Sequence, residues 1–416
     1  MCDYYIATLQ TDLEKIFGML FLDKVHVGTM CLCYFRLLSC SSFMEKRGHS
    51  KHKKKKDADK AVEDVEQSIC EKLQSRVVLT KEEVQNDFPV EPARDDAWSI
   101  ETFKQKLQVK VVKMEKDDME FDVIGIDSSL ANAFRRIMLA EVPSMAVDRV
   151  FIYNNTSVIQ DEVLAHRLGL IPFKADHRLF EMHKKSTEKV KDGDEDAMAV
   201  DQDTLVFKLQ IKCKKNSRYK SPAADVAGDD MYVDHKVYSR HIEWVPVHDQ
   251  RNYYKASNIG PICDDILIAK LRPGQEVDVV MHCVKGIAKD HVKFQSVATA
   301  SYRLLPEIIL KKPVTGEMAH RLKVCFPKGV IKVDSVSGEE VARVANSRRD
   351  TCSREVLRHS DLKECVELTR VKDHFIFTVE SVGALPPNVI FTEAVDILMQ
   401  KCQTLIKEID QPSHSN

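Results

Sequence analysis

The chain has 416 residues, enough for two or three domains and a substantial hydrophobic core. It carries 62 Lys and Arg against 64 Asp and Glu, a formal net charge of −2, which excludes a global positive field that would hold a nucleic acid. The longest uncharged apolar run near the N-terminus, Val25–Phe35, falls well short of the ~20 residues that span a bilayer, so we expect no membrane association.

Twelve cysteines are spread along the chain. No CxxC pair occurs, and only Cys31 and Cys33 stand close together, whereas zinc sites usually bring their ligands in close pairs. The spread also differs from a small secreted disulfide framework, which favours a reducing intracellular compartment. We therefore expect no structural zinc and no cofactor.

The first 96 residues are expected to form a disordered tail. Its basic run at 46–60, KRGHSKHKKKKDADK, is typical of a solvated segment. Clustered lysines are also what nuclear import receptors recognise, and the two interpretations are compatible. The same run leaves a second function open, that of an independent nuclear nucleic-acid-binding protein, whose affinity would fall steeply with salt.

The stretch Asp127–Pro143, DSSLANAFRRIMLAEVP, predicts one amphipathic helix. Asp127 or Ser128 can accept a hydrogen bond from the free amides of the first turn, and Pro143 cannot continue the helix. An apolar stripe recurs at helical spacing, and two adjacent arginines project away from it. By itself this pattern is equally typical of an ordinary core helix.

Strands are expected before and after this helix. Phe103–Val112 and Met119–Ile126 flank the charged turn Glu115–Asp118, which predicts a hairpin, and Met145–Tyr153 follows the helix. Further strands are expected at Leu205–Cys213, Lys236–Trp244, Ile266–Leu271, Glu276–Val284, Gln295–Leu304, Val330–Val336, Glu340–Val344 and His374–Glu380. Shorter helices are expected at Asp161–Leu168, with Gly169 as a C-cap, and at Ser353–Val366.

The charged, low-complexity segment 184–203 holds few bulky apolar residues, so we expect a disordered acidic loop there. The chain closes with a long helix that opens at Pro386–Pro387–Asn388. Its apolar residues alternate in steps of four and three over some twenty residues, a narrow seam suited to packing against another helix.

Known catalytic motifs are missing: the sequence has no GxxxxGK[ST], GxGxxG, GxSxG or HExxH. The loop Lys285–His291 fits either an anion-binding nest or a loop presented to a partner. The residues alone therefore indicate a multi-domain α+β interaction protein with a nuclear-type tail and no catalytic residues.

Three long motifs in order resemble the α-like subunits of cellular RNA polymerases, and among them the larger α-like subunit shared by eukaryotic polymerases I and III. They are ANAFRRIMLAEVPSMAVD, NNTSVIQDEVLAHRLGLIPF and DDILIAKLRPGQEVDVVMHCVKGIAKDHVKFQSVATASYRLLPEI. The resemblance covers about Asp95 to Asp410. It implies a dimerisation domain, an antiparallel sheet with two long helices, formed by residues 97–142 and 296–412, and interrupted by a β-rich insert at 143–295.

The resemblance further implies a non-catalytic assembly subunit of a nucleotidyltransferase complex. Such a subunit would pair with a smaller α-like subunit and nucleate the core enzymes that make rRNA, 5S rRNA and tRNA in the nucleolus and nucleoplasm. The pair would dock mainly onto the second-largest subunit, and no specific DNA contact is expected.

The resemblance places residues in two groups. The residues expected in the subunit's own core and the dimer seam are Leu130, Phe134, Ile137, Met138, Phe391, Val395, Leu398, Cys402 and Leu405. The residues expected to contact large subunits are Arg135, Arg136, His166, Arg167, Gly169, Lys285, Gly286, Lys289, Asp290 and His291. A rigid arginine fork suits a carboxylate or a cluster of backbone carbonyls at such an interface.

Overall fold

The structure is a computed structural model that describes residues 75–85, 99–182, 203–216, 231–254, 259–336 and 338–410. The basic run at 46–60 and residues 184–202 of the expected acidic loop lie outside the described residues. The chain divides into two compact units, each assembled from distant stretches. The first comprises Met1–Val112, Glu120–Asn132 and Tyr302–Phe377, and the second comprises Lys113–Met119, Ala133–Ser301 and Thr378–Asn416. This division groups the final helix with the expected insert, whereas the expected domains separate them.

A six-stranded sheet, most of which belongs to the first unit, has the order β2-β1-β18-β4-β3, with β15 also paired to β18. Its strands are β1 (Arg76–Leu79), β2 (Val84–Gln85), β3 (Gln108–Met114), β4 (Asp118–Ile124), β15 (Val297–Leu310) and β18 (Val366–Ser381). Alternate residues of β4 and β18 point to one face, where Phe121 stacks on Phe377 with ring centroids 5.2 Å apart. The predicted hairpin is present, since β3 and β4 are hydrogen-bonded neighbours joined by the turn at Glu115–Asp118.

Strand β1 lies where a disordered tail was expected, so that expectation is wrong for these residues. It pairs antiparallel with β18, with Arg76 opposite Val371 and Leu79 opposite Leu368. Val77 and Leu79 are buried. Four residues are too short to show a strand pattern in the sequence, and the pairing comes from a strand almost three hundred residues away.

Helix α4 (Ile100–Lys106) is a second correction, because a strand was expected to begin at Phe103. Phe103 is the buried residue of this helix, and the amide of Leu107 bonds back to its carbonyl. The chain therefore becomes extended only at Gln108, where β3 begins. The end of α4 meets Gly125, whose φ is +83° and whose added Cβ would clash with the backbone carbonyl of Lys106. Only glycine fits that turn.

The predicted organising helix is present as α5 (Ser128–Ala140). A carboxylate oxygen of Asp127 accepts a hydrogen bond from the Ser129 amide at 3.1 Å, which identifies Asp127 as the residue that caps the first turn.

The insert is built on a four-stranded antiparallel sheet in the second unit, with the order β11-β7-β14-β5. These strands are β5 (Ser144–Asn155), β7 (Thr204–Lys212), β11 (Glu243–Val245) and β14 (Glu276–Gly286). Around it lie β6 (Phe173–Lys174), β8 (Lys214–Lys215), β9 (Tyr232–Val233), β10 (Lys236–Tyr238), β12 (Gly260–Pro261), β13 (Leu267–Lys270), α6 (Asp161–Gly169), α7 (Gln250–Tyr253), η1 (His177–Leu179), η3 (Ser239–His241) and η5 (Val292–Phe294).

The strand expected at Lys236–Trp244 is interrupted by the η3 turn. There the amide of Ser239 bonds to the carbonyl of Ile266 and the amide of Ile242 bonds back to Ser239. Both sheets are antiparallel and carry helices beside them, so the expected α+β fold class is confirmed.

Between β15 and β18 lies a small substructure that we call the β16–β17 module (residues 311–365). It contains α8 (Gly316–Val324), β16 (Ile331–Val336), β17 (Glu339–Val344), η6 (Ser347–Arg349), η7 (Glu355–Arg358) and α9 (Ser360–Lys363). The predicted hairpin is present. The single helix expected at Ser353–Val366 is instead two short helices, η7 and α9, and β18 begins at Val366. Arg354 has a positive φ, and His359 between the two short helices is extended with φ −92° and ψ 117°, so no continuous helix forms.

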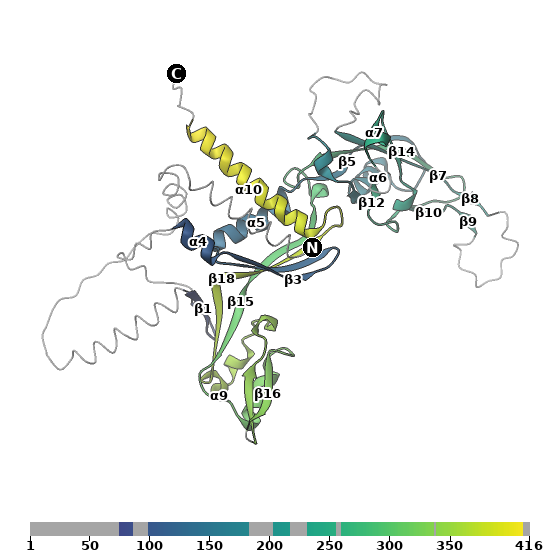
Figure 1. Ribbon diagram of the computed structural model, residues 1–416. Helices are drawn as coiled ribbons and strands as arrows, with labels where there is room; N and C mark the ends of the chain where they lie inside the picture. The colour runs from purple at the N-terminus through teal and green to yellow at the C-terminus, as the bar shows by residue number, and fades with distance from the viewer. Residues whose placement is uncertain are drawn as a thin grey trace, which may run out of the picture. The chain divides into compact units, whose positions relative to one another are not determined.

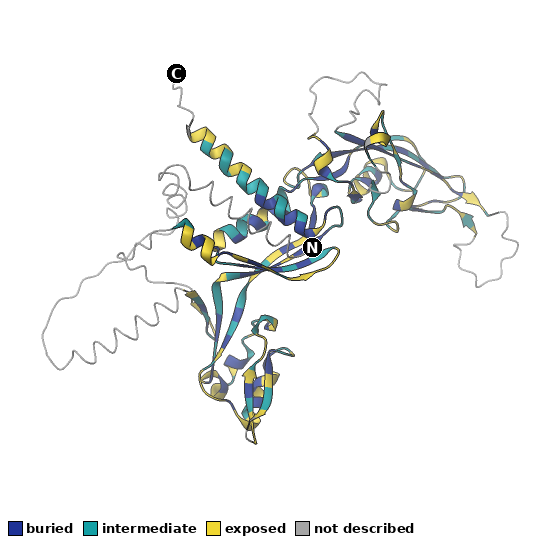
Figure 2. Ribbon diagram, viewed as in Figure 1, coloured by how far each residue is buried: buried dark blue, intermediate teal, exposed yellow. Residues whose placement is uncertain are grey.

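The predicted final helix is α10 (Pro387–Asp410). Figure 2 shows its first turns dark with burial and its later turns intermediate or exposed. No helix within the described ranges is long and apolar enough to cross a membrane.

Candidate dimerisation surface

The two predicted apolar stripes meet inside the second unit. Phe134 of α5 and Phe391 of α10 pack edge to face, with ring centroids 5.5 Å apart and an interplanar angle of 63°. Both rings are fully buried, as are Met138 and Val395, and Ile137 is 4% exposed. These five residues are therefore enclosed by the chain's own fold.

The stripe of α10 continues beyond this enclosed part. It consists of Phe391, Val395, Leu398, Cys402, Leu405 and Ile409. Their spacing of four and three residues keeps all six on one side of a helix with 3.6 residues per turn. Burial falls along the stripe: Leu398 and Cys402 are half-buried, whereas Leu405 is 47% exposed and Ile409 is 52% exposed. We call the segment from Leu398 to Ile409 the outer stripe.

An ion pair links the outer part of α10 to the residue that follows α5. The Lys401 ammonium lies 2.5 Å from a carboxylate oxygen of Glu141, just after the end of α5. Both side chains are at least a quarter exposed, so solvent screens the pair and its contribution to stability is small. Leu130, the last of the nine predicted residues, is half-buried on α5.

The opposite side of α10 faces a polar cluster near its base. The imidazole of His177, which is 2% exposed, lies 3.8 Å from a carboxylate oxygen of Glu393. Contact with His177 holds the pKa of Glu393 below its ordinary value. Lys285 donates a hydrogen bond to the carbonyl of Phe180 at 3.1 Å, and burial lowers the pKa of its ammonium group. This cluster anchors the base of α10 away from the stripe.

The residues predicted to contact large subunits divide by exposure. Arg136 is exposed on α5, whereas Arg135 is half-buried and has a contact within the chain. On α6, His166 is exposed. Arg167 instead donates to the backbone carbonyls of Leu267 and Ile268 at 2.8 and 3.1 Å, so its fork already holds β13 against α6.

The expected C-cap at Gly169 is wrong, because Gly169 is the last residue of α6 and has no positive φ, and Leu170 is the C-cap. Leu170 follows with helical angles, and its amide bonds to the carbonyls of His166 and Arg167. The helix end is closed by this tight last turn without a left-handed residue.

The expected loop Lys285–His291 is partly strand, because β14 continues to Gly286. A Cβ on Gly286 would lie 2.7 Å from the ring of Phe294, so the side chain is absent where that ring packs. The remaining loop is short and exposed at Lys289, Asp290 and His291. It bonds to the end of α5 through the Lys289 amide and the Ala140 carbonyl at 2.8 Å.

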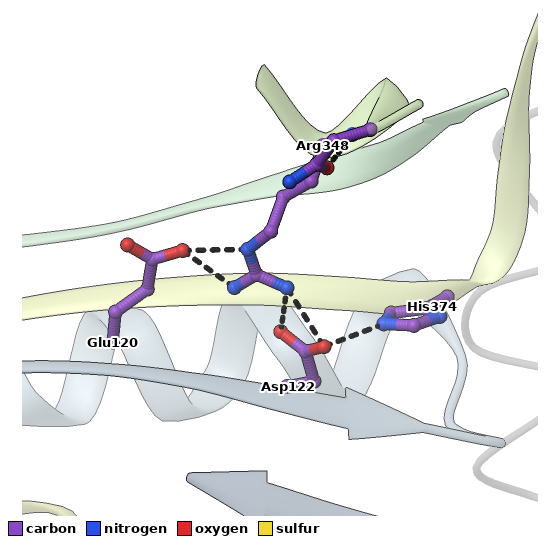
Figure 3. A network of polar contacts seen from close by, with 5 residues as sticks. Glu120, Asp122, Arg348 and His374 are labelled. Atoms are coloured by element: carbon purple, nitrogen blue, oxygen red, sulfur yellow. Dashed lines mark hydrogen bonds and ion pairs between the residues drawn. The ribbon is translucent and has the colours of Figure 1, made fainter. Parts of the chain in front are cut away.

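One polar network was missed by the sequence analysis. Arg348 of η6 donates to Glu120 at 2.8 Å and to both carboxylate oxygens of Asp122 at 2.7 and 2.8 Å, and His374 lies 3.0 Å from Asp122 (Figure 3). Its members come from η6, β4 and β18, all in the first unit. The only signal in the sequence is the arginine pair at 348–349, which gives no indication of its partners.

Metal chemistry has no evident place in the part of the chain that the structure describes. No group of three or more His, Cys, Asp or Glu side chains there has a geometry that could hold a metal ion. Burial raises the pKa of the Cys283 and Cys213 thiols, which keeps both in the protonated form that ligates metals poorly.

Comparison with known proteins identifies the family to which the chain belongs. Residues 120–402, more than half of the chain, match the RNA polymerase Rpb3/Rpb11 dimerisation domain. The chain belongs to this family. The match runs from Glu120 in β4 to Cys402 in α10, so it spans α5, the four-stranded sheet, the β16–β17 module and the first two thirds of α10.

Several relatives in the Rpb3/Rpb11 family are similar over most of the chain. The DNA-directed RNA polymerases I and III subunit RPAC1 of Mus musculus is 53% identical over 345 residues, 82% of this chain and 96% of the relative. The subunit of the same name in Saccharomyces cerevisiae is 43% identical over 320 residues, 77% of this chain and 92% of the relative. The DNA-directed RNA polymerase II subunit rpb3 of Dictyostelium discoideum is 28% identical over 311 residues, 73% of this chain and 95% of the relative.

Proposed function

We propose that this chain is the larger α-like subunit shared by nuclear RNA polymerases I and III, a part of a nucleotidyltransferase complex that supplies no catalytic residue itself. Support comes from the higher identity to subunits named for polymerases I and III than to one named for polymerase II. In this role the chain pairs with a smaller α-like subunit and forms the platform on which the large subunits assemble, in the nucleolus and nucleoplasm.

The outer stripe of α10 is the observation that carries the pairing. When a second apolar helix covers an apolar stripe that was exposed to water, the free energy of the pair falls. The outer stripe lies on the same side of α10 as the buried residues Phe391 and Val395. A partner helix that covers the outer stripe would therefore extend the packing of α5 against α10. The inner residues Phe134 and Phe391 support this surface from within.

The pairing is tested by placing charges on the outer stripe. Leu405→Asp with Ile409→Asp is expected to remove the smaller α-like subunit when the tagged chain is co-expressed with it and purified. Losing two buried apolar side chains costs about 3 kcal/mol or more, which corresponds to at least about a hundredfold in affinity. Both positions are about half exposed in the single chain, so its own melting temperature should stay unchanged.

The matched control is Gln400→Asp, which adds a negative charge at an exposed position on the opposite side of α10. It should leave the recovery of the smaller subunit unchanged. Full recovery with the stripe variant would contradict the proposed surface. Replacing Phe134 and Leu398 together with Asp would be a poorer test, because Phe134 is fully buried and its replacement would unfold the chain itself.

A second surface is proposed for the large subunits. Of the ten residues predicted for it, the exposed ones are Arg136, His166, Arg167, Lys289, Asp290 and His291. Arg167 is nevertheless engaged inside the insert, and Lys285 and Gly286 serve the packing around Phe180 and Phe294. We therefore propose Arg136, His166 and the Lys289–His291 loop as the contacts.

A further inference from the structure

The β16–β17 module joins the rest of the first unit through the ends of β15 and β18 (Figure 1). Its apolar core is shared with these strands and with β1, through residues such as Ile308, Leu368 and Val77. Apolar packing of this kind is non-directional and depends mainly on the area removed from water. It holds the module at the strand ends, where the Arg354 guanidinium also donates a hydrogen bond to the carbonyl of Thr80 at 3.3 Å.

Arg348 forms a further polar attachment, at a different strand, β4. The end of β17 is fixed inside the module, because the amides of Ala345 and Asn346 bond to the carbonyl of Val330 at 2.8 and 3.3 Å. The side chain of Asn346 then accepts from the Arg348 amide at 3.1 Å and caps η6. These bonds fix the backbone from which the arginine extends.

The partners of Arg348 lie on the six-stranded sheet. Glu120 and Asp122 alternate on β4, so both point to the face opposite the buried Phe121, and Asp122 also meets His374 of β18 (Figure 3). The Arg348 side chain is 19% exposed and that of Asp122 is 9% exposed, so solvent screens these bonds little. A guanidinium held by two carboxylates on separate edges of its fork can take only one orientation.

We propose that Arg348, with Glu120, Asp122 and His374, is a latch that sets the orientation of the β16–β17 module on the six-stranded sheet. Arg348 is a positioning residue in this arrangement. A module held at one angle presents its outer surface, including the 85% exposed side chain of Val324, in a single orientation. A binding partner then meets a preorganised surface, which reduces the loss of conformational freedom on binding.

The latch is tested by measuring a distance across it in the full chain. Spin labels are placed as unnatural amino acids at Val324 on the module and at the exposed Lys110 on β3, and pulsed electron paramagnetic resonance gives the distribution of distances. The unaltered chain should show one narrow distribution. Arg348→Gln should broaden it at least twofold, and Arg348→Lys, which keeps the charge without the fork, should broaden it less.

The control is Arg343→Gln. It breaks an exposed 2.7 Å ion pair with Asp334 inside the β16–β17 hairpin and should leave the width of the distance distribution unchanged. An unchanged width in Arg348→Gln, with only a lower melting temperature, would show that Arg348 merely stabilises the fold and would overturn the proposal. If Arg348→Gln does not fold, Arg348→Lys decides: a width equal to that of the unaltered chain overturns the latch.

Discussion

Phe134 of α5 and Phe391 of α10 form an edge-to-face pair with ring centroids 5.5 Å apart, and neither ring is exposed. This pair marks the point where the two stripes belong to the chain's own core. The stripe begins to open toward solvent at Leu398, seven residues further along α10, so the first turns of this helix belong to the core and its later turns expose an apolar surface.

The first prediction distinguishes the buried part of α10 from its exposed part. Phe391→Ala should lower the free energy of unfolding of the single chain by about 3–5 kcal/mol, because it removes a fully buried ring and leaves a cavity. Leu405→Ala should change it by no more than about 0.5 kcal/mol, because that side chain is already about half exposed. Urea denaturation of both variants measures the difference, and equal losses would place the core boundary elsewhere.

The second prediction concerns Gly286 and the Phe294 ring. Gly286→Ala would bring a methyl group to 2.7 Å from that ring, which is buried and cannot swing into water. The free energy of unfolding should fall by about 1–3 kcal/mol. Gly169→Ala is the control, since its added Cβ has ordinary contact with the Val147 carbonyl at 3.7 Å and should be neutral or slightly stabilising in thermal melts.

The third prediction tests the proposed contact with large subunits. Arg136→Glu should reduce the recovery of the large subunits in affinity purification, because it reverses the charge at an exposed position of α5. The smaller α-like subunit should still be recovered, since Arg136 lies off the apolar stripe. Lys407→Glu makes the same charge change on the polar side of α10, and an identical recovery profile for the two variants would argue against a role for Arg136.

The fourth prediction follows from the pKa of Asp122. Burial acts to raise this pKa, but hydrogen bonds from His374 and Arg348 outweigh it, so the pKa lies below its ordinary value. The folded chain therefore releases this proton more readily than the unfolded chain. The contribution of Asp122 to the free energy of unfolding is fully present above its pKa in the unfolded chain, about 3.9. It is lost as the pH falls through its pKa in the folded chain.

Urea midpoints of the unaltered chain and of Asp122→Asn, measured between about pH 7 and pH 3, check this linkage. The urea midpoint of the unaltered chain should exceed that of Asp122→Asn most near neutral pH, and this difference should shrink on acidification. A difference between the two urea midpoints that stays constant over this pH range would mean that the network does not stabilise the carboxylate charge.

Local patterns in the sequence predicted the elements that depend on local chemistry. Helices α5 and α10 follow from apolar periodicity and a cap or a proline at one end, and the long strands follow from their alternation and turn residues. Short elements escaped this reasoning: β1 acquires its pairing from β18, and α4 begins in a stretch that reads equally as a strand. Their conformations are decided by contacts with distant residues, as the wrong helix at Ser353–Val366 also shows.

The sequence by itself determined that α10 carries one continuous apolar stripe and that the family motifs occur in order. Only the tertiary structure decided where that stripe passes from core to exposed surface, because Val395 and Leu405 have the same spacing and chemistry but different neighbours. It alone brought Arg348 to Asp122, 226 residues away. Periodicity records which side of an element is apolar, and burial depends on what the rest of the fold places against that side.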